Sequence, residues 1–298
     1  MAASPPLDSP VLARLLDLVA PRAGSKPPRR DTPSPANDPA ASTPPAPDII
    51  GFACNICGHR GSLAVESLER EAGNCQRCGA TVRARAIVHH LSMALFGRSL
   101  PIGRFPWRGR RITGLGMTDS DVYARPLAKR LRYRNTYFHA DPRLDIRDPD
   151  RALIGSCDFV TSSDVMEHVD PPVRDAFVNL RRLLKPGGVL VLTVPFAMEG
   201  ETREHFPDLF DYRIERKGDG YVLINRTRDG VAQRYDDLVF HGGPGSTLEL
   251  RLFSRSGLAQ VLGDAGFGEV TFHPEPCLAH GVHWKWPWSV PITARAVS

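Results

Sequence analysis

Residues 157–196 read CDFVTSSDVMEHVDPPVRDAFVNLRRLLKPGGVLVLTVPF and carry the strongest structural signal in the chain. The pattern predicts a buried strand over residues 157–161, a helix over residues 172–184 and a second buried strand over residues 189–194. Strands that are apolar throughout are typical of a parallel sheet with helices on both faces. This stretch therefore predicts an α/β fold.

The alternation of strands and helices begins further upstream. Residues 112–116 (ITGLG) predict a short strand, residues 121–131 a helix and residues 135–140 (NTYFHA) a second strand. Asp145 follows so soon after Asp141 that a third strand must be short or absent. We therefore expect a Rossmann-like, doubly wound and mostly parallel sheet.

Polar side chains stand at or just after the ends of these predicted strands. Ligands of open α/β sheets bind at the carboxyl ends of the strands, so these residues mark a candidate site. They are Asp141, Asp145, Ser163, Asp164 and His168.

Two Cys-x-x-Cys-Gly turns precede the sheet, with Cys54 and Cys57 in the first and Cys75 and Cys78 in the second. Such turns let backbone amides approach thiolate sulfurs, and two of them supply the four soft ligands that tetrahedral zinc prefers. Four thiolates leave no position open for water, so the pattern favours a structural zinc ribbon over a catalytic zinc site. A redox dithiol is the alternative, but it usually stands at the start of a helix. Residues 83–96 predict an amphipathic helix behind the ribbon, and we expect the ribbon and the sheet to have separate cores.

The run 157–196 resembles the second half of class I S-adenosylmethionine-dependent methyltransferases. It shares their Asp-hydrophobic strand, EHV-type segment, helix, Leu-Lys-Pro-Gly-Gly turn and apolar strand. The stretches ITGLGMTDSDVYARPLA and NTYFHADPRLDI resemble a zinc-ribbon-bearing subset of that family. The resemblance covers residues 51–196 and the tail from Phe253, and it is weak between them.

The resemblance implies a set of residues for the cofactor. Gly114 and Gly116 would allow close backbone approach, although the turn GLGMTD lacks the third glycine of the fuller motif. Asp141 would accept the ribose hydroxyls, and Asp145 with Ile146 would contact adenine. Ser163, Asp164 and Val165 would border the methionine moiety, and His168 would lie on the sulfonium side or serve structurally.

Residues 197–252 form an insertion without a clear place in the sheet, and such insertions at the carboxyl edge commonly bind substrate. His241 opens the glycine-rich run HGGPG and is a candidate catalytic base, with a plain turn as the alternative; His205 fits a structural role better. Trp284, Trp286 and Trp288 alternate along one segment, which suits either packing beneath the insertion or the stacking of sugars or bases.

Residues 1–50 contain 12 of the 27 prolines and no aromatic residue, so we expect a disordered tail, with a docking helix over residues 11–19 as one option. Residues 51–100 would form the ribbon and its helix, and residues 101–298 the main domain with the insertion. No apolar run is long enough for a membrane span, and the chain opens without the features of a secretory signal, so a cytoplasmic protein is expected.

Three hypotheses for the function follow. The first is a methyltransferase that acts on a small-molecule or glycan-type acceptor, with a structural zinc ion. The second is an RNA methyltransferase whose arginine-rich ribbon grips phosphates. The third is an inactive methyltransferase fold that serves as a protein-binding adaptor. The net charge of +5 makes nucleic acid binding possible without requiring it.

Overall fold

The computed structural model describes residues 48–297, apart from 242 and 244 and the side chain of residue 108. The helix expected over residues 11–19 and nearly all of the expected tail lie outside these residues. The first described strand, β1, begins at Ile49.

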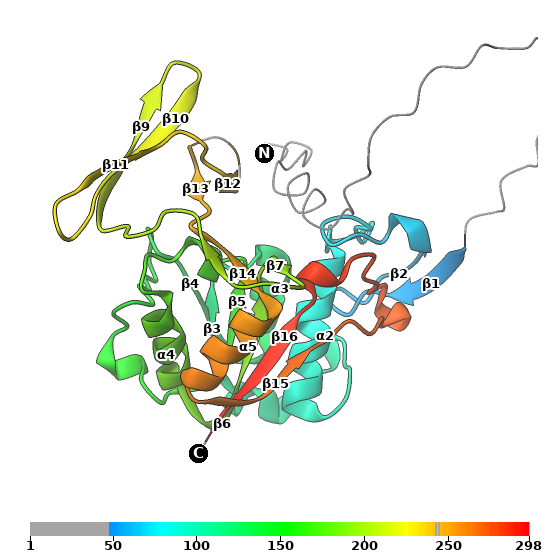
Figure 1. The fold of residues 1–298 in the computed structure, drawn as a ribbon. Helices are drawn as coiled ribbons and strands as arrows, with labels where there is room; N and C mark the ends of the chain where they lie inside the picture. Colours follow the sequence, from blue (N-terminus) through cyan, green and yellow to red (C-terminus); the bar gives the residue numbers. More distant parts are fainter. Residues whose placement is uncertain (1–47, 242, 244, 298) are drawn as a thin grey trace, which may run out of the picture. The chain divides into compact units, whose positions relative to one another are not determined.

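A six-stranded sheet with the strand order β15-β16-β6-β5-β3-β4 forms the centre of the described region (Figure 1). The strands are, in chain order, β3 Thr113–Met117, β4 Arg132–Thr136, β5 Cys157–Ser163, β6 Leu184–Thr193, β15 Phe267–Phe272 and β16 Ile292–Ala296. The four strands β3 to β6 pair in parallel, whereas β16 runs antiparallel to both of its neighbours. The Rossmann-like α/β expectation is confirmed, with a mixed sheet in which only β16 is reversed.

The expected second strand was placed too late in the chain. It is β4, which ends at Thr136; Tyr133 and Thr136 are buried, Asn135 is partly buried, and the two arginines of RYRNT are exposed. Among the described residues between β4 and β5 there is no further strand, only an isolated bridge between Tyr137 and Arg143 and the short 3-10 helix η4 Arg151–Leu153. β4 is therefore an edge strand.

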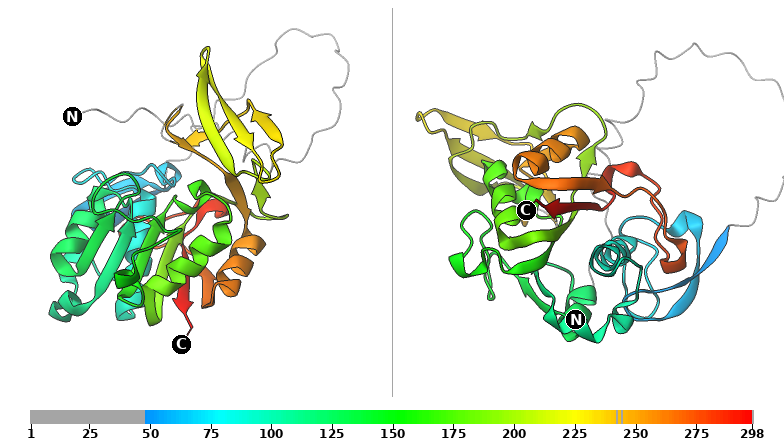
Figure 2. Two further views of the ribbon diagram at one scale, coloured as in Figure 1. Left: turned by 90° about the vertical axis from the view of Figure 1, so that its left-hand side faces the viewer. Right: turned by 90° about the horizontal axis from the view of Figure 1, so that it is seen from below.

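Helices cover both faces of the sheet (Figure 2). Within residues 48–297 the α-helices are α2 Val82–Phe96, α3 Asp121–Arg130, α4 Val173–Leu183 and α5 Arg255–Asp264. On one face α4 and α5 pack with Val160, Leu190 and Leu192, and on the other α2 and α3 pack with Phe159 and Val189. Neighbouring residues of one strand thus point to opposite faces of the sheet, because side chains along a β-strand alternate between the two faces.

The segment before the sheet is a hairpin with two cysteine turns that leads into α2. Its strands are β1 Ile49–Ala53 and β2 Arg60–Ala64, and Thr81 caps α2 by accepting a hydrogen bond from the amide of Ala84 (3.2 Å). Cys54 and Cys75 belong to the same apolar cluster as Phe159 of β5. The expectation of separate cores is therefore wrong, because α2 places the cysteine turns directly against the sheet's own packing layer.

The hairpin is also joined to the C-terminal segment. Arg85 is fully buried and donates to the carbonyl groups of Ala80 and Gly281, the latter at 2.7 Å. His280 Nδ1 donates to the carbonyl of Ala53 (2.8 Å). The C-terminal segment therefore supplies part of the surface on which the hairpin rests.

The insertion folds into short strands outside the central sheet (Figure 1). They are β7 Phe196–Ala197, β8 Arg203–Glu204, β9 Asp211–Lys217, β10 Gly220–Arg226, β11 Ala232–Tyr235, β12 Phe240–His241, β13 Thr247–Leu248 and β14 Arg251–Ser254. β9, β10 and β11 form an antiparallel sheet, and β14 pairs with β7 and β8. A small core of Phe206, Leu223, Leu248 and Leu250 holds the insertion together.

The tryptophan segment does not form one extended strand. Residues Pro287–Ser289 are a 3-10 turn, and Trp284 packs against the main core while Trp286 is 43% exposed. Among the described residues no ring contact joins the three tryptophans, so of the two alternatives a row of rings for stacking is not seen, and Trp284 packs instead. In the described part of the chain, no helix has the length and apolar character of a membrane span.

Candidate active site

The carboxyl ends of β3 and β5 lie side by side, because Met117 pairs with Ser162. Both glycines of the predicted cofactor motif lie inside β3 rather than in the turn after it. A Cβ atom at Gly114 would lie 2.1 Å from the Phe159 ring, and one at Gly116 would lie 1.9 Å from the Tyr133 hydroxyl. Packing thus requires glycine at both positions, and contact with a cofactor remains a prediction.

Asp119 organises the turn after β3. Tyr133 donates its hydroxyl hydrogen to Asp119 Oδ2 (2.6 Å), and Thr161 donates to the same oxygen. Asn135 accepts from the Asp119 amide (2.9 Å) and donates to the Asp119 carbonyl (2.8 Å). Burial raises the pKa of Asp119 to about 6, although these hydroxyl donors oppose the shift. The aspartate fixes the turn between three adjacent strands.

The predicted ribose and adenine residues lie in the loop after β4. Asp141 is five positions beyond the end of the strand, and its exposed side chain has no hydrogen-bond partner among the described residues. Asp145 is paired with Arg147 (3.0 Å), and Ile146 is 4% exposed within the main core. Arg147 hydrogen bonds lower the pKa of Asp145, outweighing its partial burial. Asp141 is thus the carboxylate available to a ligand.

Two arginines from the N-terminal segment reach the end of β5. Arg70 and Arg83 both form ion pairs with Asp164, and Arg83 also donates to the Ser163 hydroxyl. Glu71 bridges the two arginines. Burial raises the pKa of Asp164, but the charges of Arg70 and Arg83 outweigh this and lower it to about 2. Ser163 and Asp164 are thus engaged by two arginines from a distant segment, and their contact with the methionine moiety remains a prediction.

Val165 follows directly and packs against the main core. Its partly buried side chain continues the wall formed by Ser163 and Asp164. A contact between Val165 and the cofactor remains a prediction.

The structure brings His168 and His241 into direct contact, although 73 residues separate them. Nδ1 of His241 lies 2.9 Å from Nε2 of His168. Nε2 of His241 lies 2.9 Å from Glu249, whose other oxygen accepts from His205 Nε2 (2.8 Å). We refer to Glu167, His168, His205, His241 and Glu249 as the histidine cluster.

The hydrogen-bond partners of the histidine cluster indicate which of its groups carry protons. Nδ1 of His168 donates to the Leu248 carbonyl (2.7 Å), so its Nε2 offers a lone pair. Burial lowers the pKa of His168 to about 4, which keeps the ring neutral near pH 7. Burial raises the pKa of Glu249, but hydrogen bonds from His205 and His241 outweigh it and lower the pKa to about 2.

Glu167 faces the two histidines from the turn after β5. Its Oε1 is 3.8 Å from His168 Nε2 and 3.9 Å from His241 Nδ1. The side chain is 1% exposed, and neither carboxylate oxygen has a hydrogen-bond partner within the part of the chain that the structure describes. Burial, and then the nearby charge of Asp164, raises the pKa of Glu167 well above its ordinary value.

Arg251 fixes the backbone of the turn that carries Glu167 and His168. The side chain is fully buried and donates to the carbonyl groups of Met166 (2.9 Å) and Val169 (2.6 Å) and to Glu204 (2.8 Å). The Leu250 amide also donates to the Glu167 carbonyl (2.9 Å). The insertion is thereby fixed to the segment that carries Glu167 and His168.

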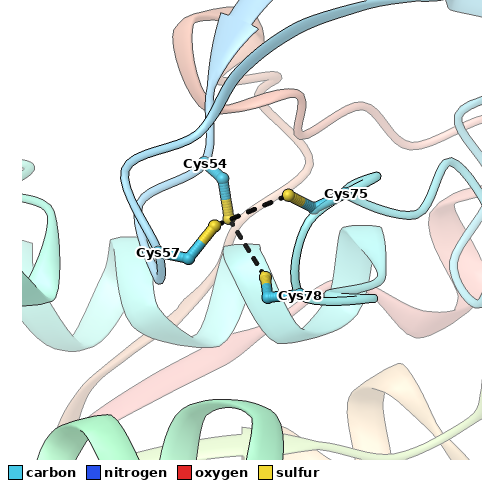
Figure 3. Close-up of side chains that lie close together, drawn as sticks. All are labelled: Cys54, Cys57, Cys75 and Cys78. Carbon is cyan, nitrogen blue, oxygen red and sulfur yellow. Dashed lines mark hydrogen bonds between the residues drawn. The ribbon is translucent and has the colours of Figure 1, made fainter.

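The four cysteine sulfurs converge between the hairpin and α2 (Figure 3). Sγ of Cys54 is 3.7 Å from Sγ of Cys78, and Sγ of Cys57 is 3.6 Å from Sγ of Cys75. A zinc ion with four thiolates at about 2.3 Å requires sulfur–sulfur distances of about 3.8 Å. Amides of Ile56 and Cys57 approach Cys54, and those of Arg77 and Cys78 approach Cys75. The residues present therefore fit a tetrahedral thiolate site.

A family model described as a methyltransferase domain matches residues 111–271, which is more than half of the chain. The chain therefore belongs to this family, and the class I S-adenosylmethionine-dependent methyltransferase predicted from residues 157–196 is confirmed.

Solved structures with a similar fold are remote in sequence. A 1,6-didemethyltoxoflavin-N1-methyltransferase of Burkholderia thailandensis, with bound 1,6-didemethyltoxoflavin and S-adenosylhomocysteine, is 16% identical with a TM-score of 0.39, over 72% of this chain and 79% of that chain. An amino pentose methyltransferase from Micromonospora echinaspora is 17% identical with a TM-score of 0.38, and the match covers 72% of this chain and 94% of that chain. A sugar N-methyltransferase from Streptoalloteichus is 15% identical with a TM-score of 0.37, and the match covers 64% of this chain and 84% of that chain. No curated protein sequence matches the chain.

Sequence reasoning missed several residues of the site. Asp119 and Glu167 stood in the motifs GLGMTD and MEH, where an acidic residue beside a strand end was the available signal. Arg70, Arg83 and Glu249 carried none, because their roles depend on contacts with distant segments.

Proposed function

We propose that this methyltransferase transfers a methyl group from S-adenosylmethionine to a small-molecule or glycan-type acceptor. The observation that carries the proposal is the histidine cluster, which the end of β5 and the insertion build together. The cluster combines nitrogen bases with carboxylates and remains partly open, since His168 and His241 are 12% and 24% exposed. Such a site suits an acceptor whose reacting atom must lose a proton.

The donor would bind along the carboxyl ends of β3, β4 and β5. The proposed contacts are Gly114, Gly116, Asp141, Asp145, Ile146, Ser163, Asp164 and Val165. Asp141 is the strongest ribose candidate, because Asp145 already pairs with Arg147. Arg70 and Arg83 would hold Ser163 and Asp164 in position beside the methionine moiety.

Methyl transfer is an in-line displacement at the sulfonium, so the protein mainly aligns donor and acceptor. The bond between the methyl carbon and sulfur breaks as the carbon bonds to the acceptor oxygen or nitrogen, and the acceptor releases its proton. His168 and His241 are the proposed proton acceptors. Neutral His168 offers Nε2 once an acceptor group replaces its contact with His241. A neutral His241 whose Nε2 donates to Glu249 would offer Nδ1, and Glu249 would stabilise the positive charge that His241 gains with the proton.

The four cysteines would hold a structural zinc ion. The sulfur distances and the approaching amides support this assignment, and four thiolates leave no open position for chemistry. The ion would fix the segment from which Arg70 and Arg83 reach the site.

We expect Asp141→Ala to weaken binding of S-adenosylmethionine by about 2 kcal/mol, roughly 30-fold, because charged hydrogen bonds to ribose hydroxyls are lost. Isothermal titration calorimetry on the full chain measures this. Asp219→Ala, an exposed aspartate in the β9–β10 turn, is the matched control and should bind like the parent. Equal affinity of both variants would remove Asp141 from the donor site, and a parent that binds no cofactor would favour the inactive adaptor.

We expect only weak RNA binding, with a Kd no better than tens of micromolar near physiological salt. Arg70 and Arg83 are held by Asp164 and Glu71, and Arg85 is buried, so these cations are not available to phosphates. Fluorescence anisotropy with labelled RNA over a salt series measures the affinity. Sub-micromolar binding at about 150 mM salt that Arg98→Glu and Arg104→Glu abolish would support the RNA hypothesis instead.

A further inference from the structure

We propose that Glu167, His168 and His241 form a binding site for a divalent transition-metal ion, separate from the four-cysteine site. One ligand atom from each residue lies within 4.8 Å of the other two. Two imidazole nitrogens and one carboxylate oxygen form a donor set that zinc and its first-row neighbours accept.

The distances fit a single ion. Ligand atoms about 2.1 Å from one metal ion lie about 3.0 Å apart at a right angle and about 4.2 Å apart when opposite. The two histidine nitrogens are 2.9 Å apart, and Glu167 Oε1 lies 3.8 and 3.9 Å from them. All three separations therefore fall in the range that shared coordination allows.

The far nitrogens of both histidines have the partners that metal-bound histidines typically have. Nδ1 of His168 donates to the Leu248 carbonyl, and Nε2 of His241 donates to Glu249. Such outer hydrogen bonds orient an imidazole and direct the lone pair of its other nitrogen toward the metal. In both rings this other nitrogen is the one that faces Glu167.

Glu167 supplies the independent observation. Both of its carboxylate oxygens are buried without a hydrogen-bond partner, which is costly for a polar group of any charge state. A cation between Oε1 and the two histidine nitrogens would satisfy this carboxylate. The charges of Asp164 and Glu249 also act on this position, offset in part by Arg70.

Three protein ligands leave coordination positions open, as in catalytic rather than structural metal sites. An ion there would occupy the two ring nitrogens that otherwise accept a proton. It would bind an oxygen of a hydroxyl-bearing acceptor and lower the pKa of that hydroxyl, so that the proton passes to solvent beside the partly exposed histidines. This last step rests on the proposed methyl transfer, whereas metal binding by the three residues does not.

The test is a titration of the purified full chain with Co²⁺, without cofactor or acceptor, by calorimetry and visible absorption. We expect one added equivalent to bind with weak d–d absorption and no thiolate-to-cobalt charge-transfer band. Glu167→Gln and His241→Ala should each lower the affinity by about 100-fold or more, and Glu249→Gln by about 10- to 100-fold. Circular dichroism and thermal unfolding check that each variant folds. If Glu167→Gln does not fold, His241→Ala alone provides the test.

His139→Ala is the matched control, because it removes an exposed histidine outside the cluster. It should bind Co²⁺ like the parent. The proposal is overturned if the parent binds no ion up to about 1 mM, a weak-binding limit. It is equally overturned if the folded ligand variants retain the parent's affinity, or if the only new absorption arises from thiolate-bound cobalt.

Discussion

Cys75→Ser is expected to release the metal ion and to destabilise the whole methyltransferase domain, not the hairpin alone. The reason is the shared core, in which Cys54 and Cys75 pack in one cluster with Phe159 of the central sheet. Binding of structural zinc is worth about 10–16 kcal/mol in small zinc domains, so its loss should lower the free energy of unfolding by at least about 4 kcal/mol. In a domain of this size the melting temperature should fall by about 10 °C or more.

Elemental analysis and differential scanning calorimetry of the full chain test this expectation. Cys277→Ser is the matched control, since it makes the same exchange outside the four-cysteine site. It should keep the metal and change stability by about 1 kcal/mol or less. A Cys75→Ser protein that has lost its metal and still melts like the parent would show that the sheet does not depend on the hairpin.

The second large effect is expected for Asp164→Asn. The exchange leaves Arg70 and Arg83 with Glu71 as the one remaining carboxylate that both of them contact, and their side chains are only 16% and 25% exposed. Breaking a buried charge pair on one side costs about 3–5 kcal/mol, and because Glu71 remains we expect a loss at the lower end, about 3 kcal/mol, near pH 7 in chemical denaturation.

The pH dependence provides a second readout for this variant. Arg70 and Arg83 hold the pKa of Asp164 at about 2, below the ordinary value of 3.8. A carboxylate with a lowered pKa contributes stability above its unfolded pKa, and this contribution is lost as the pH falls through the folded pKa. The difference between parent and variant should therefore be full above about pH 4 and shrink toward pH 2.

Asp121→Asn is the control for both readouts. Asp121 also pairs with an arginine, Arg125, but the two side chains are 55% and 76% exposed. An exposed pair contributes about 0–1 kcal/mol. A loss for Asp164→Asn that is no larger than this would mean that the two buried arginines find other partners.

The sequence predicted the central elements where local pattern and packing agree. Strand β5 and helix α4 lie within two residues of their predicted bounds, because their apolar residues pack on a sheet covered from both sides. Strand β4 was misplaced because it lies at the sheet edge and its sequence RYRNT is largely polar. Edge strands give a weaker hydrophobic signal, since fewer of their side chains are buried.

The sequence identified individual residues of the candidate site, but it did not predict which of them contact one another. His168 and His241 were identified separately, but their contact depends on the course of an insertion with its own small core. Arg70 and Arg83 counted only toward the arginine-rich ribbon of the RNA hypothesis, yet they contact Asp164 across 94 and 81 positions of sequence. Local pattern carries no information about such pairings, which arise when the chain closes on itself.

The attachment of the hairpin to the C-terminal segment has a consequence for how the protein forms during synthesis. The four cysteines precede all strands of the central sheet in the sequence, so the zinc ion proposed for them could bind before the sheet has been made. The surface that receives the hairpin is completed late, because Ala53 pairs with His280, 227 positions further on, and Arg85 with Gly281. Contacts this distant in sequence slow folding. An ion bound before that point would therefore be held in an undocked hairpin until residues 280 and 281 have been made.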